Sequence, residues 1–226
     1  MANKYVLKFT KDGYAKYTSH LDLLRFFKRA FRKSGIALSY SQGFNPHPKL
    51  GFAQPLSLGY SSICELLEFT TDVPYNTDEI YKMLAEMMPE GLNILWCKEL
   101  DDGIKSLAAI ADYAEYQVLI PYDIEAEKLE EISNGYLAQD EIQAMKRQKK
   151  DKKLVPIDIK HMIRNFEASV QKGEIKLNLL LDCGSISNCS PELVIASFCE
   201  YGKIDVPRYA MEVERTVLGF SNNLQF

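Results

Sequence analysis

The chain has few of the features that mark exported, membrane-spanning or metal-binding proteins. Its five cysteines are scattered and contain no CxxC pair, a pattern that predicts reduced thiols and argues against a zinc or iron–sulfur site. No apolar run approaches the roughly 20 residues that cross a bilayer. The start, MANKYVLKFTKDG, lacks the apolar core of a secretory signal. We therefore expect a cytoplasmic protein with no membrane partner, no metal and no cofactor.

Signatures of a self-sufficient enzyme are also missing from the sequence. It contains no phosphate-loop glycine pattern, no dinucleotide-binding fingerprint and no recognisable nucleophile–base arrangement. With 226 residues, 46% of them hydrophobic and 26% charged, the chain has the composition of one large globular domain or two ordinary ones. We expect an accessory or binding protein more than an enzyme, and the sequence does not indicate which small molecule, if any, it binds.

The net charge of −4 conceals a strong segregation of charge along the chain. Residues 1–60 carry 10 Lys and Arg against 2 Asp and Glu, whereas residues 61–145 carry 4 against 19 and residues 146–226 carry 13 against 10. Polyanions respond to local potential and not to the average charge. The basic first quarter therefore favours a nucleic-acid partner, although charged runs of this kind also serve as ordinary solvated surface.

Hydrophobic periodicity predicts the order β-α-β-β-α-β in the first half of the chain. The expected strands are 5–10, 36–41, 63–70 and 92–97, and the expected helices are 19–34 and 77–88. A Pro- and Gly-rich stretch, 42–59, separates the second and third strands. After a joint at 101–112 the pattern recurs, with strands 113–120, 175–182 and 208–217, helices 124–133 and 191–201, a charged arm 141–153 and an insertion 155–170. The predicted fold is α+β, with two ferredoxin-like units, 1–101 and 112–226, packed together.

The helix expected over 19–34 is strongly amphipathic. Its apolar residues fall on one broad face, which must be buried against a sheet. The opposite face carries five cations, Arg25, Lys28, Arg29, Arg32 and Lys33. Such a row could follow a phosphate backbone or lie on an anionic membrane. The core needs the aromatic residues of this helix, which argues against the membrane alternative, and a plain solvated helix remains possible.

The stretch 42–59, QGFNPHPKLGFAQPLSLG, is the second candidate site. Loops of this length inside compact domains are usually functional. Phe44, Asn45, His47 and Lys49 combine an aromatic ring with polar and cationic groups, which suits stacking on unpaired bases and contact with phosphate. The alternative is that Phe44 and Phe52 simply cover the sheet.

Two further features carry weaker hypotheses. His20 and His47 could meet and act as general base and acid in RNA cleavage, although a histidine near a helix start is more often structural. The run KRQKKDKK contains Lys146, Arg147, Lys149 and Lys150. Such a run could bind nucleic acid or simply protect a sheet edge from aggregation.

The segments SHLDLLR, SYSQGFNPHPK and PLSLG resemble a bacterial family of unknown function, the radical-SAM-associated (radical-SAM-linked) proteins, and VPIDIKHMIRNF resembles a later segment of that family. The resemblance implies a radical SAM enzyme as partner, and family members are often encoded near an RNA-processing ribonuclease and ribosomal proteins. The chain has no CxxxCxxC motif, so it cannot hold the radical SAM cluster in the usual way. The matching residues become candidate site residues: Ser19, His20, Asp22, Gln42, Asn45, His47 and Lys49.

We therefore expect a non-catalytic accessory protein of a radical SAM system that binds tRNA or rRNA through the basic helix and the aromatic loop. One alternative is an RNA-processing or RNA-modifying enzyme that uses His20 and His47. The other is a protein–protein adaptor for a radical SAM enzyme, without nucleic acid.

Overall fold

The computed structural model describes residues 3–101, 103–148, 153–221, 224 and 226. They form two compact units, Met1–Ala111 with Leu218–Phe226, and Asp112–Val217. Each unit combines helices with antiparallel strands, which confirms the α+β class. Among the described residues, no helix has both the length and the apolar character needed to span a membrane.

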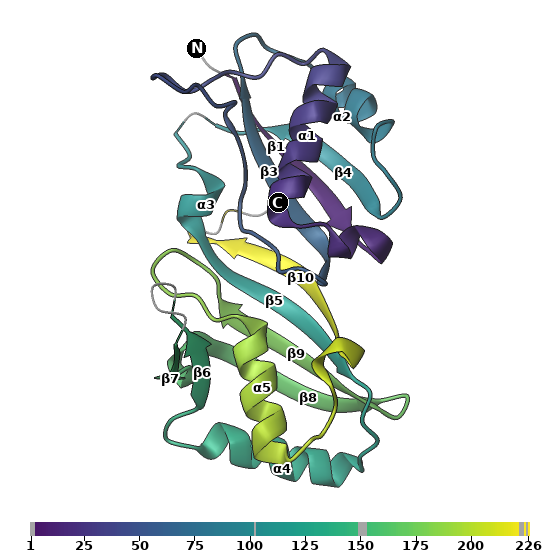
Figure 1. Cartoon of the computed structure of the whole chain (residues 1–226), viewed down its shortest axis with the longest axis vertical. Helices are drawn as coiled ribbons and strands as arrows, with labels where there is room; N and C mark the ends of the chain where they lie inside the picture. The colour runs from purple at the N-terminus through teal and green to yellow at the C-terminus, as the bar shows by residue number, and fades with distance from the viewer. Residues whose placement is uncertain (1–2, 102, 149–152, 222–223, 225) are drawn as a thin grey trace. The chain divides into compact units, whose positions relative to one another are not determined.

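The first unit places two helices on one face of an antiparallel sheet (Figure 1). β1 lies between β3 and β4, and β3 also pairs with the short β2. The elements of this unit, in chain order, are β1 (Asn3–Lys11), a 3-10 turn (Gly13–Tyr17), α1 (His20–Ser34), β2 (Leu50–Phe52), β3 (Ser61–Thr71), α2 (Thr77–Ala85), β4 (Leu92–Glu99) and α3 (Leu107–Ile110).

Aromatic packing joins α1 to the sheet. Phe27 lies with its ring centroid 5.1 Å from that of Phe9 on β1, and Phe31 lies 4.7 Å from Phe69 on β3. All four side chains are buried. Burial of each such side chain contributes about 1.5–3 kcal/mol, so this contact fixes which face of α1 points outward. The apolar face predicted for this helix is confirmed.

The strand predicted over 36–41 is wrong. Only isolated bridges form there, Leu38 with Thr71 and Tyr40 with Pro48. The prolines at 46 and 48 have no N–H to donate, so no continuous ladder forms through this segment. The second strand is instead β2, inside the stretch that the sequence predicted to be a loop.

The second unit also contains a four-stranded sheet, and its main helices are α4 and α5 (Figure 1). Its strands lie in the order β10-β5-β9-β8, and the hairpin β6-β7 stands apart from that sheet. The elements are β5 (Ala111–Ile120), α4 (Ala126–Ala138), β6 (Gln143–Arg147), β7 (Leu154–Asp158), a 3-10 turn (Lys160–Met162), β8 (Ile163–Gln171), β9 (Glu174–Asp182), α5 (Pro191–Gly202), a 3-10 turn (Arg208–Ala210) and β10 (Glu212–Phe220).

The expected insertion over 155–170 is also wrong, because most of β8 lies within it. β8 pairs with β9 and buries Phe166, while the residues on either side of Phe166 point to solvent. The inserted element is the charged arm, whose strand β6 pairs with β7 and not with the main sheet. The helix predicted over 124–133 instead begins at Ala126 and continues to Ala138. The last strand begins later than predicted, because the segment after Pro207 turns first.

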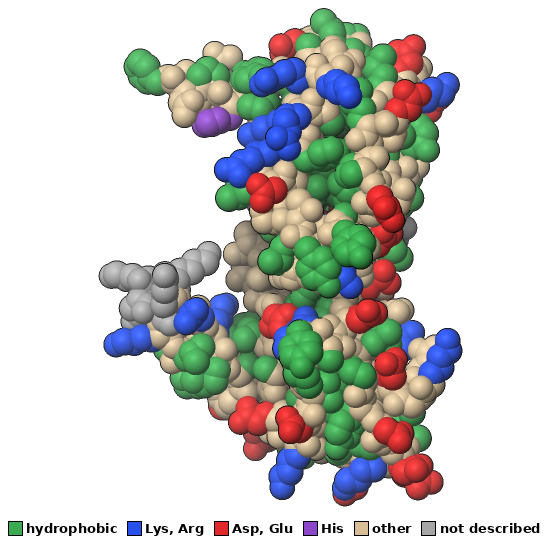
Figure 2. All heavy atoms as spheres, turned by 45° about the vertical axis from the view of Figure 1, so that its right-hand side comes forward, with side chains coloured by type: hydrophobic (Ala, Val, Ile, Leu, Met, Phe, Trp, Pro, Cys, Tyr) green, Lys and Arg blue, Asp and Glu red, His purple; other side chains and the backbone are tan. Residues whose placement is uncertain are grey.

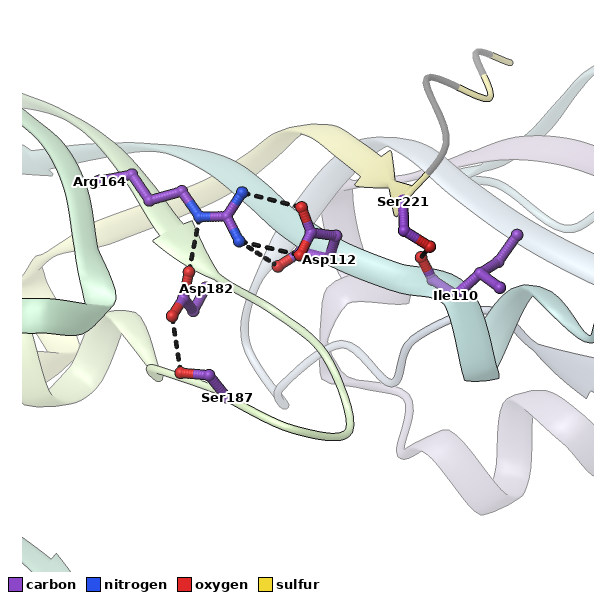
Figure 3. Close-up of polar contacts among 6 residues, drawn as sticks. All are labelled: Ile110, Asp112, Arg164, Asp182, Ser187 and Ser221. Atoms are coloured by element: carbon purple, nitrogen blue, oxygen red, sulfur yellow. Dashed lines mark hydrogen bonds and ion pairs between the residues drawn. The ribbon is translucent and has the colours of Figure 1, made fainter.

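The last residues of the chain group with the first unit, whereas the sequence analysis assigned them to the second. Ser221 Oγ donates to the Ile110 carbonyl oxygen at 3.3 Å (Figure 3). Lys8 Nζ donates to the Phe226 carbonyl oxygen at 3.2 Å, and the Phe226 ring lies 6.2 Å from that of Trp96. These contacts attach the tail to β1 and β4.

Arg164 ties three strands of the second unit together (Figure 3). From β8, its guanidinium donates to both carboxylate oxygens of Asp112 on β5, each at 2.9 Å, and to Asp182 on β9 at 2.6 Å. Ser187 donates to the second oxygen of Asp182 at 2.6 Å. The hydrogen bonds from Arg164 hold the pKa of Asp112 below its usual value. This Arg belongs to the VPIDIKHMIRNF segment, and its contacts give that segment a structural role.

Replacing Arg164 with Met should lower the free energy of unfolding by about 1–2 kcal/mol at pH 7, because charge-assisted bonds are lost from a partly exposed site. The lowered pKa of Asp112 stabilises the fold above about pH 4, and this contribution is lost as the pH falls. The difference in the free energy of unfolding between wild type and variant, measured by urea titration, should therefore become smaller below pH 4. Lys128→Met, which breaks an exposed pair with Glu131, should cost almost nothing. An equally large loss in both variants would contradict the assignment.

Gly91 occupies a position that no other residue fits. Its φ is +85°, and a Cβ there would lie 2.5 Å from the Asp12 carbonyl oxygen, a backbone atom that cannot move aside as a flexible side chain could. The Asp12 N–H in turn donates to the Gly91 carbonyl oxygen at 2.9 Å. Gly91→Ala should destabilise the protein by about 2 kcal/mol or more. Gly103→Ala, with open space and no positive φ, is the matched control, and equal thermal stability of the two variants would contradict the prediction.

Candidate nucleic-acid interface

The SHLDLLR motif builds the start of α1. Ser19 is the N-cap, and its Oγ accepts from the Asp22 N–H at 3.2 Å while donating to the Asp22 carboxylate at 2.7 Å. Asp22 also accepts from Arg25 at 2.8 Å. These bonds, Ser19 first and then Arg25, lower the pKa of Asp22. Two of the motif's candidate site residues, Ser19 and Asp22, therefore have a capping role. The predicted helix end is confirmed, with Gly35 at φ +79°.

The cationic face of α1 points to solvent. Arg25, Arg29, Arg32 and Lys33 are exposed, and Lys28 is partly buried. Within the described part of the chain, Arg25 is the member of this set that forms an ion pair, with Asp22. Arg32 and Lys33 lie in the last turn, where cations favour the helix dipole. Figure 2 shows Lys and Arg side chains gathered on the face from which a loop projects.

That loop has a closed base and an exposed tip. The Ser41 N–H donates to the His47 carbonyl oxygen at 2.8 Å, and Ser41 Oγ accepts from the His47 N–H at 2.9 Å. The Lys49 N–H then donates to the Ser39 carbonyl oxygen at 2.8 Å. Gly43 has a φ of +131°, which only glycine adopts easily. We call residues 41–47 the projecting loop (Figure 1).

The two phenylalanines of the 42–59 stretch have different roles. Phe52 is buried on β2 and contacts Phe9 and Phe27, so it covers the sheet as the structural alternative predicted. Phe44 is fully exposed at the tip of the projecting loop, beside the exposed Asn45. It contributes nothing to the core. A single exposed apolar side chain is common on protein surfaces, so Phe44 carries weight only together with the cations of α1.

A hollow of about 490 Å³ lies between α1 and the base of the projecting loop. Lys28 and Arg32 line its helix side, and Tyr40 and Pro48 line its loop side. Tyr40, half exposed, was not among the predicted site residues. No local sequence signal singled it out, because the hollow is also lined by the consecutive residues 35–38 and the segment 36–41 does not form a strand.

The structure does not link the two candidate catalytic histidines. His20 is partly buried at the start of α1, with its ring 5.1 Å from that of Phe52. His47 is exposed in the projecting loop, and it bonds to Ser41 through its backbone N–H and carbonyl oxygen, not through its ring. No hydrogen bond or ring contact joins them within the residues that the structure describes. The catalytic alternative therefore stays a prediction without a geometric argument in its favour.

The basic arm is only partly described. Lys146 and Arg147 are exposed residues of β6, which pairs with β7 and lies against α5. Lys149 and Lys150 lie outside the described residues. An exposed, charged strand of this kind fits either protection of a strand edge or binding of an anion.

Burial lowers the pKa of His20, with a smaller opposing contribution from Glu65 and a smaller lowering contribution from Lys11. Because the folded pKa is lower than the unfolded one, His20 stabilises the fold above about pH 6.5 and this contribution is lost as the pH falls. Its ring signals in NMR titrations should therefore have a midpoint below about 6.5. The variant His20→Gln assigns the signals and should remove that part of the pH dependence. A midpoint at or above 6.5 would contradict the environment described.

Comparisons with solved structures identify a similar fold. A chain of the crystal structure of a Cbf5-Nop10-Gar1 complex is similar over 95% of this chain and 49% of that one, with 12% identity and a TM-score of 0.51. The present chain thus spans about half of its length, and the likeness concerns the fold alone. An unknown protein from Galdieria sulphuraria matches 96% of this chain and 100% of its own, with 9% identity and a TM-score of 0.28, which is too low to support an argument.

No curated protein sequence matches this chain. A family model, described as an uncharacterized protein conserved in bacteria (DUF2344), matches residues 4–191. The match includes α1, the projecting loop and the cluster that Arg164 forms with Asp112 and Asp182, which we call the Arg164 cluster. The chain therefore belongs to this uncharacterised bacterial family, DUF2344.

Proposed function

We propose that the protein is a non-catalytic accessory that binds RNA through the cationic face of α1 and the projecting loop. The observation that carries this proposal is the placement of four exposed cations of α1 in the same unit as a loop with a fixed base and an exposed Phe44. A phosphate backbone supplies the anions, and unpaired bases supply the stacking partners.

Repulsion among the cations of α1 favours a role in binding an anionic ligand over a role as plain solvated surface. The five cations form five pairs at i,i+3 or i,i+4 spacing, and each such pair costs about 0.2–0.5 kcal/mol. Only Arg25 has a compensating carboxylate among the described contacts. Arg32 and Lys33 gain from the helix dipole, but Arg25, Lys28 and Arg29 lie too far from the helix end for this effect. Phosphate groups would relieve the repulsion.

We propose the ferredoxin-like fold for each unit. In the first unit, β3 lies between β1 and β2 and is antiparallel to both, and α1 connects the outer two. In the second, β9 lies in the same way between β5 and β8. This arrangement is the split β-α-β pattern. Sheets of this class bind single-stranded RNA in several families, but the fold alone does not decide function.

A radical SAM enzyme is the partner that we propose, on the basis of the SHLDLLR, SYSQGFNPHPK and PLSLG segments. The enzyme would bring its own cluster. The Cys97 and Cys189 thiols are poor ligands as they stand, because burial raises the pKa of each to about 12. In this arrangement the chain presents RNA to the enzyme, in the cytoplasm where reduced thiols persist.

Reversing the charge of α1 tests RNA binding directly. The triple variant Arg25→Glu, Arg29→Glu and Arg32→Glu should weaken binding of tRNA and of a single-stranded oligonucleotide by about tenfold or more. It should also reduce the slope of log K against log salt by about 3, because each lost phosphate contact removes about one unit. Fluorescence anisotropy at several salt concentrations measures both quantities.

The matched control changes three exposed cations elsewhere, Lys98, Lys105 and Lys128, to Glu. Both triple variants alter the net charge equally, so only a local effect distinguishes them. An equal loss of RNA affinity in the two variants would mean that binding depends on net charge and not on the cations of α1. Unchanged binding after reversal of the α1 charges would overturn the proposal. If a radical SAM partner is then still captured after nuclease treatment, the adaptor alternative takes its place.

A further inference from the structure

The hollow beside α1 has two chemically different sides. Lys28 and Arg32, one helical turn apart, line one side. The opposite side contains Tyr40 and Pro48, and Phe31 and Ile36 provide an apolar floor. Phe31 is 1% exposed and Ile36 3% exposed, so this floor is part of the core and is fixed in place. The hollow therefore combines a cationic side with an apolar, partly aromatic one.

The cationic side suits a phosphate. Neither Lys28 nor Arg32 has an ion-pair partner among the described contacts. The hollow lies toward the C-terminal end of α1, where the dipole contributes about half a negative charge. Two full positive charges exceed that contribution, so the local potential favours an anion. Arg32 can also bind phosphate through two parallel hydrogen bonds.

The aromatic side suits a base. Tyr40 is 52% exposed, which leaves much of its side chain available for contact. Its backbone is held by the bridge to Pro48, and the next residue, Ser41, closes the loop through its two bonds to His47. Because the backbone is already held and a tyrosine has only two χ angles to fix, stacking on this side chain costs little conformational entropy. The volume of about 490 Å³ lies within the usual range for small-ligand pockets.

We propose that this hollow binds one unpaired nucleotide of an RNA strand, with its phosphate on Lys28 and Arg32 and its base against Tyr40. The inference rests on the proposed RNA binding and specifies its substrate class. A base within a duplex is already stacked and paired, so the hollow selects single-stranded RNA, or a loop, over double-stranded RNA. Stacking on a tyrosine tolerates any base, and the site therefore has little sequence preference.

The test compares an intact single-stranded RNA oligonucleotide with one of the same length that lacks its bases. In anisotropy titrations, Tyr40→Leu should weaken binding of the intact strand about 5- to 100-fold, with no change in salt slope. Tyr40→Phe should bind like wild type. The strand without bases should bind wild type and Tyr40→Leu equally. Lys28→Gln with Arg32→Gln should reduce the salt slope by about 0.7 for both strands, because one phosphate contact of a single strand is lost.

Tyr14→Leu is the matched control, because Tyr14 is 88% exposed in the same unit and does not line the hollow. It should leave every affinity unchanged, and unfolding curves should show that both Leu variants fold. If wild type binds the intact strand but Tyr40→Leu has no effect, or weakens both strands equally, the hollow is not a base site and the proposed function stands. If wild type binds neither strand, the proposed function fails, and the base site with it.

Discussion

The packing of Phe27 and Phe31 against Phe9 and Phe69 is the contact on which the candidate site depends. Burial of these rings contributes several kcal/mol, whereas repulsion within the cationic row of α1 costs roughly 1–2.5 kcal/mol in total. The core contact therefore prevails and holds the helix in one orientation. The cations face solvent because their helix has no other way to bury its apolar face, and the row stays ordered without a ligand.

The projecting loop depends on a second constraint, the closure of its base. Prolines at 46 and 48 prevent a regular ladder, so a few specific bonds, chiefly those between Ser41 and His47, hold the base instead. The tip is then free of any packing role. This arrangement accounts for two features that are unusual in a folded domain: the full exposure of Phe44 and the φ of +131° at Gly43.

The two units use ionic groups differently. In the second unit, Arg164 bonds with Asp112 and Asp182, and all three charges are used to join strands. In the first unit, the cations of α1 are largely left without such partners among the described contacts. Paired charges mainly serve stability, and unpaired ones raise the local potential. This contrast is why the first unit, and not the Arg164 cluster, is the candidate binding surface.

Local patterns in the sequence were enough to predict much of the fold. Periodicity predicted the helices over 19–34 and 191–201, which match α1 and α5 closely. The structure shows Ser19 and Gly35 capping α1 and Ser190 capping α5, and such signals act within one or two turns. The segment 36–41 and the short β2 were misassigned, since strand pairing depends on partners far away in the sequence. The insertion was misplaced for the same reason, because β8 becomes a sheet strand only through β9.

The features of the candidate site also fall into two groups, those that the sequence predicts and those that only the tertiary structure decides. By itself, the sequence determined that α1 has a basic face and that the 42–59 stretch is unusual, because both are properties of neighbouring residues. Only the tertiary structure decided that Phe52 is buried while Phe44 is exposed, and that His20 packs against Phe52 while His47 is exposed. It alone brought Tyr40 opposite Lys28 and Arg32. This arrangement brings together a helix and a loop, whose relative positions are set by the core beneath them and not by any local pattern.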